Sequence, residues 1–117
     1  MSTKEVVIHA LIYADNLLQI ENSLKQEFEN SYFRKIEQNS VLIFENTLIR
    51  FSVEYDGKAF YLVGRNKNNL ENSMSVIENL VKAFKESSLN FSIDYQEEEH
   101  LNGIPTSEEF NISSIFE

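Results

Sequence analysis

The chain has 117 residues, no cysteine and a formal net charge of −9. This length accommodates one domain, and a 42% hydrophobic content supplies enough apolar surface for a core, which excludes a disordered chain. The absence of cysteine excludes disulfides, thiolate zinc sites and cysteine nucleophiles. No stretch reaches the roughly 18 apolar residues of a membrane span, and the N-terminus has no signal-cleavage pattern, so a cytoplasmic protein is expected.

The first predicted elements are a strand and a helix. Residues 4–13 are almost continuously apolar and rich in β-branched side chains, which is typical of a central strand buried on both faces. Asp15 follows and is the predicted N-cap of the helix. Apolar residues at spacings of three and four then predict an amphipathic helix that ends near residue 30: Leu17, Ile20, Leu24 and Phe28.

A β-rich stretch follows the helix. Residues 32–38 alternate only loosely and end in a turn signal at Asn39-Ser40, before an apolar run over residues 41–44. Residues 48–55 alternate apolar and polar side chains, which indicates a half-buried strand. Asp56-Gly57 predicts a type I′ turn, because both central positions of that turn need positive φ, and residues 58–63 are the returning strand.

The second helix is predicted after a polar loop over residues 64–69, with Asn68 or Asn69 as its cap. Apolar residues recur at helical spacing from Leu70 to Phe84, and Ser87-Ser88 ends the helix. Residues 89–95 alternate as a final half-buried strand.

Residues 1–95 are therefore predicted to form a single two-layer α+β domain of order β-α-β-β-β-α-β. In this arrangement two helices cover one face of a mostly antiparallel sheet. The order is similar to that of ferredoxin-like folds with an extra strand in the middle.

The C-terminal extension, residues 96–117, is predicted to be irregular. Residues 87–117 carry seven acidic side chains and no Lys or Arg. The extension also contains more large apolar side chains than a disordered tail usually carries, so it is expected to pack on the domain or on a partner.

Catalytic, metal and cofactor sites are not predicted. His9 lies in the first strand and is interpreted as a packing residue. His100 follows three glutamates, but consecutive residues of an extended segment point to opposite sides, so a solvated acidic run is favoured over a metal site. The loop at residues 64–69 has two cations but a single glycine, so an ordinary connection is favoured over a phosphate site.

The acidic extension instead predicts a protein-binding module that engages a basic partner, such as an inhibitor, an immunity-type protein or an adaptor. Charge would steer the encounter and apolar anchors would supply affinity. The predicted contact residues are Asp94, Glu97, Glu98, Glu99, Glu108, Glu109, Phe110 and Phe116. A negative net charge disfavours direct nucleic-acid binding.

Three alternatives remain open. The extension could cover the domain's own sheet while its acids face water and maintain solubility. The chain could form a homodimer through an edge strand or through the extension. A pocket between sheet and helices could also bind a small ligand or support an enzyme.

Overall fold

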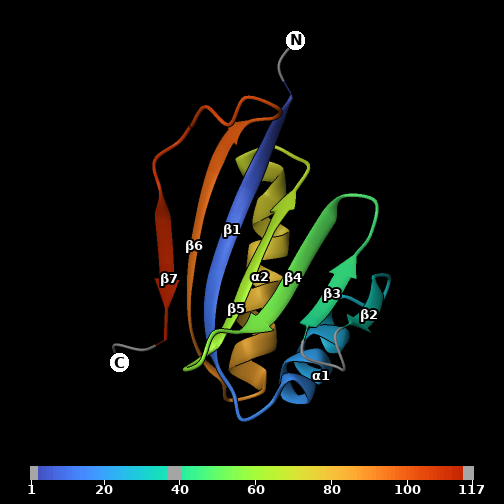
Figure 1. The fold of residues 1–117 in the computed structure, drawn as a ribbon. Helices are drawn as coiled ribbons and strands as arrows, with labels where there is room; N and C mark the ends of the chain where they lie inside the picture. Colours follow the sequence, from blue (N-terminus) through green and yellow to red (C-terminus); the bar gives the residue numbers. More distant parts are fainter. Residues whose placement is uncertain (1–2, 37–40, 115–117) are drawn as a thin grey trace.

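The computed structural model describes residues 3–36 and 41–114 and has the predicted two-layer α+β architecture (Figure 1). Two helices lie on one face of an antiparallel sheet. The predicted element order is present with two further strands, β2 and β7. The elements are β1 (Lys4–Tyr13), α1 (Leu17–Glu27), β2 (Tyr32–Ile36), β3 (Val41–Glu45), β4 (Ile49–Tyr55), β5 (Phe60–Asn66), α2 (Leu70–Glu86), β6 (Asn90–Glu99) and β7 (Phe110–Ser113).

The strands lie in the order β2-β3-β4-β5-β1-β6-β7, and every described neighbouring pair is antiparallel. Strands β5 and β6 both pair with β1, which lies between them, so β5 and β6 run parallel to each other. With α2 as their connection they form the split β-α-β unit of ferredoxin-like folds. The first such unit, β1-α1-β2, is split by three strands instead of one, because β3, β4 and β5 lie between its ends.

The core lies between the sheet and the helices. The β1 side chains that face the helices are at most 1% exposed: Val6, Ile8, Ala10 and Ile12. The expectation that β1 is buried on both faces is wrong for the other face, where Val7, His9 and Leu11 are only half-buried. Both helices lie on the same side of the sheet, so in the described chain no helix covers these three residues (Figure 1).

Both helices begin at asparagine caps. For α1 the predicted cap is wrong by one residue: Asn16, and not Asp15, accepts a hydrogen bond from the Gln19 N–H at 3.0 Å. The Gln19 side chain reaches back to the Asp15 N–H, which places Asp15 just outside the helix. For α2 the predicted cap Asn69 is confirmed, since its side chain accepts from the Asn72 N–H at 2.8 Å.

The turn between β4 and β5 is longer than the predicted type I′ turn. Four residues, 56–59, separate the closing pair Tyr55 and Phe60, and within the turn only Gly57 has positive φ, at 102°. The Asp56 carboxylate accepts the N–H groups of Lys58 and Ala59, which supplies the turn's hydrogen bonds without a second left-handed residue. These hydrogen bonds, first that of Ala59, lower the pKa of Asp56.

The C-terminal region is more regular than its composition predicts. Strand β6 continues to Glu99, through the boundary expected at residue 95, because residues 96–99 pair with β1 in the same register as the rest of the strand. Strand β7 then pairs with β6, and its Phe110 ring stacks on Tyr95 with ring centroids 5.3 Å apart. The extension therefore packs on the domain, since pairing with a neighbouring strand overrides the weak strand preference of a glutamate run.

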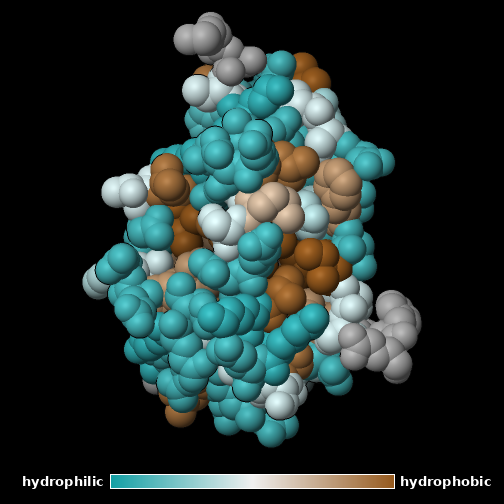
Figure 2. Space-filling view, turned by 180° about the vertical axis from the view of Figure 1, so that it is seen from behind, coloured by the Kyte–Doolittle hydropathy of each residue, from teal (hydrophilic) through white to brown (hydrophobic). Residues whose placement is uncertain are grey.

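The helix-covered side is largely hydrophilic, with some apolar patches (Figure 2). Between α2 and β7 lies an apolar groove of about 380 Å³, lined by Val81, Ile112 and the side chains of neighbouring Lys and Glu residues. Within the described residues no helix is long and apolar enough to cross a membrane. The predicted turn at Asn39-Ser40 lies outside the described residues.

Candidate functional site

Glu97 is occupied inside the domain. Its side chain faces the helices and is 8% exposed. The carboxylate accepts the first backbone N–H of α2, that of Leu70, at 2.7 Å and the Thr106 hydroxyl at 2.6 Å, and it pairs with Lys4 at 3.6 Å. The Thr106 and Leu70 hydrogen bonds lower the pKa of Glu97, against the smaller opposing effect of burial. This carboxylate therefore caps α2 and holds the following loop against it.

The neighbouring acidic residues of β6 have partners within the domain. Glu98 lies on the sheet face opposite the helices, 3.5 Å from the Arg65 guanidinium. Asp94 lies on the same face and accepts the Asn111 amide at 2.7 Å. Glu99 accepts the side-chain amide of Asn102 at 2.8 Å, within an exposed turn.

The remaining predicted contact residues differ in accessibility. Glu108 and Glu109 are exposed at the start of β7. Phe110 is half-buried against Tyr95, so its ring is not a free anchor. Phe116 lies outside the described residues. Of the set predicted from sequence, the structure thus presents Glu108 and Glu109 to solvent and takes Glu97 and Phe110 into the domain.

The β6–β7 loop, residues 100–109, presents two apolar side chains that the predicted contact set omits. Leu101 is 93% exposed and Ile104 is 55% exposed. Leu101 has φ of +79°, a left-handed conformation that is unfavourable for a leucine. The sequence signal was a pair of large apolar residues between acidic ones, but their exposure follows only from the path of the loop.

The loop is held by hydrogen bonds at both of its ends. The His100 N–H donates to the Thr3 carbonyl at 2.8 Å, which ties the loop to the start of β1. The Gly103 N–H donates to the Glu99 carbonyl and the Thr106 N–H to the Glu97 carbonyl, at 3.0 and 2.9 Å. The apolar side chains at the tip are therefore displayed on an ordered backbone.

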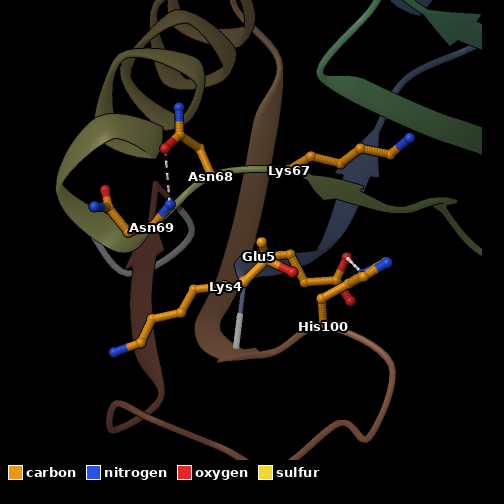
Figure 3. Close-up of a pocket in the computed structure, with 7 residues that line it drawn as sticks. Lys4, Glu5, Lys67, Asn68, Asn69 and His100 are labelled. Atoms are coloured by element: carbon orange, nitrogen blue, oxygen red, sulfur yellow. Dashed lines mark hydrogen bonds and ion pairs between the residues drawn. The ribbon is translucent and has the colours of Figure 1, made fainter. Parts of the chain in front are cut away.

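Two adjoining clefts lie beside this loop, at the end of the sheet where β1 begins. They have volumes of about 490 and 570 Å³, and they share Glu5, Lys67 and His100 in their walls. Glu5 is only 2% exposed, and its carboxylate binds the Arg65 guanidinium and, at 3.1 Å, His100 Nδ1 (Figure 3). No pattern in the sequence singles out Glu5, because its burial depends on residues 60 and 95 positions away.

The charges around these clefts are mostly paired with one another. Arg65 lies between Glu5 and Glu98, and Arg50 pairs with Glu45 at 3.6 Å. Among the described residues that line the clefts, Lys67 is the cation for which no opposite charge lies within ion-pair distance. Such a balanced network stabilises the end of the sheet without requiring a charged ligand.

The other chemical candidates from sequence have local partners. His9 lies on the open sheet face with its Nδ1 atom 2.5 Å from the Tyr61 hydroxyl, across strands β1 and β5. At the N-terminus of α2 the Glu97 carboxylate already occupies the position where a phosphate would be held, as its bond to the Leu70 N–H shows. Over residues 3–36 and 41–114 no three His, Asp or Glu side chains form a metal-binding group.

Comparison of the chain with known protein families, curated proteins and solved structures gave no match. Its function is therefore inferred from its own residues.

Proposed function

We propose that this chain is a small protein-binding module that engages a basic partner through the β6–β7 loop, as a cytoplasmic inhibitor, immunity-type protein or adaptor and not as an enzyme. The observation that carries the proposal is the display of Leu101, 93% exposed, at the tip of an ordered acidic loop. A leucine in a left-handed conformation costs stability, and such strain is retained chiefly where function requires it.

The chemistry around the tip supports a basic partner. Ile104 lies three residues from Leu101, and the two side chains supply apolar area for the centre of an interface. Glu99, Glu108 and Glu109 surround them in the sequence, and the chain from residue 87 onward has no Lys or Arg to offset their charge. Acidic groups at the rim of an apolar centre speed the encounter with a basic surface and orient it.

The hydrogen bonds of the loop also favour binding. Its backbone is fixed to β1 and β6 before any partner arrives, so less conformational entropy is lost on association than with a free tail. This differs from the predicted role of the extension, in which Phe110 and Phe116 were the anchors. In the present proposal Leu101 and Ile104 take that role, because Phe110 is packed on Tyr95.

The test is capture from the native host's lysate at low salt, with quantitative mass spectrometry of the retained proteins. The variants are L101S/I104S, which removes the apolar tip, and E108K/E109K, which reverses the rim charge. Leu18→Ser is the matched control, because Leu18 is a 56% exposed leucine on α1, away from the loop. We expect one basic protein to be retained by the wild type and by the control but lost with the tip variant. Equal retention by all four proteins would contradict the proposal.

A further inference from the structure

The sheet face opposite the helices, here called the open face, has no covering element in the described chain (Figure 1). A solvated face of an antiparallel sheet is normally polar. Here the two central strands place half-buried apolar residues on it: Val7 and Leu11 from β1, and Val63 from β5. Apolar side chains concentrated at the centre of an uncovered sheet face are typical of an interaction surface.

Charges on the open face are divided between its two sides. From β2 to β5 it carries three arginines and two glutamates: Arg34, Arg50, Arg65, Glu45 and Glu54. From β1 to β7 it carries three carboxylates and no Lys or Arg: Glu5, Asp94 and Glu98. One side is therefore slightly positive and the other clearly negative, although the whole chain is acidic.

We propose that two copies of this chain pack face to face through their open faces, related by a two-fold axis that runs along β5. Strand β5 is the fourth of seven in the sheet, so this axis lies at its middle. The rotation reverses strand order, which places the positive side of each copy over the negative side of the other. The apolar residues of β5 and β1 then meet at the centre of an isologous interface.

The strand register identifies the residues that meet. Pairing aligns Arg34, Val63 and Asp94 in one row across the sheet, with Arg34 near one end and Asp94 near the other. The two-fold axis brings Arg34 of each copy over the β6 and β7 strands of its partner. Because neighbouring strands lie about 4.8 Å apart, an arginine side chain spans the remaining offset to Asp94.

A second copy fits this face better than it fits the sheet edges. Edge β2 carries Arg34 and Lys35, which hinder pairing with another strand, and edge β7 has only four residues. The domain measures 42 × 33 × 25 Å, and its broad face offers room for the roughly 800 Å² per partner that a stable dimer buries. Repulsion between the two acidic chains is screened over about 8 Å at physiological salt.

The experiment uses the full chain in sedimentation equilibrium and light scattering at concentrations up to about 100 μM. We expect the wild type to have twice the mass of one chain. Arg34→Asp and Asp94→Arg should each give monomers, because each variant places like charges opposite one another. Neither residue is part of the core, since Arg34 is exposed and Asp94 is half-buried, so both variants should fold. Glu78→Arg is the control, since it makes the same charge change on the exposed side of α2 and should leave the dimer intact.

Mixing the two monomeric variants is the decisive step. The R34D chain then presents aspartate at positions 34 and 94, and the D94R chain presents arginine at both, so every cross-pair is attractive. Recovery of the doubled mass in the mixture, but in neither variant alone, would support the proposal. A monomeric wild type, or a mixture that stays monomeric, would overturn it and leave the open face to another partner.

Discussion

Replacement of Glu97 by glutamine tests the interpretation that this acidic residue stabilises the fold. The carboxylate accepts hydrogen bonds from the Leu70 N–H and the Thr106 hydroxyl, at 2.7 and 2.6 Å. A hydrogen bond to a charged group contributes about 1.5–3 kcal/mol, and glutamine keeps one acceptor oxygen and loses the charge. The ion pair with Lys4 adds little, because the Lys4 side chain is 43% exposed. We expect the free energy of unfolding to fall by about 2 kcal/mol at pH 7.

The pH dependence of this loss provides a second check. The folded protein lowers the pKa of Glu97 below its ordinary value of 4.5, so the unfolded chain takes up the proton at a higher pH than the folded protein does. The stabilisation is therefore complete above pH 4.5 and disappears as the pH falls through the folded-state pKa. The difference in stability between wild type and E97Q should shrink in acid.

Urea unfolding followed by far-UV circular dichroism at several pH values measures both effects. Glu99→Gln is the matched control, two residues along the same strand, where the carboxylate accepts the amide of exposed Asn102. We expect this control to change the free energy of unfolding by less than about 0.5 kcal/mol. The reasoning is refuted if E97Q unfolds at the wild-type urea midpoint, or if its loss of stability is as large in acid as at pH 7.

Three further predictions concern backbone positions, each checked by thermal and urea unfolding. Gly64→Ala should destabilise the protein by about 3 kcal/mol, because its Cβ would overlap the Phe51 ring and the Arg50 carbonyl; a near-wild-type midpoint would contradict this. Gly57→Ala meets no atom within 4 Å and should cost only about 1 kcal/mol, from its positive φ. Leu101→Asn should raise stability by about 0.5 kcal/mol, since asparagine tolerates φ of +79°, while it weakens partner capture; reduced stability would show that Leu101 is not strained.

Periodicity in the sequence was sufficient to predict both helices and the central strands. The stripe Leu17, Ile20, Leu24 and Phe28 is buried as predicted, because an amphipathic helix has one way to place that face against a core. The Asn69 cap was predictable for a similar reason, since its side chain bonds to a backbone group three residues away. Local chemistry of this kind is written in neighbouring residues.

Tertiary structure decided the C-terminal half of β6, the β7 strand and the roles of the acidic residues. A Gln-Glu-Glu-Glu run has little preference for a strand, and it forms one here because β1 offers ten residues of pairing partners. Among neighbouring carboxylates, Glu97 is taken up by the N-terminus of α2 whereas Glu108 faces solvent. Composition alone could not separate these two, because each environment is set by residues distant in the chain and close only after folding.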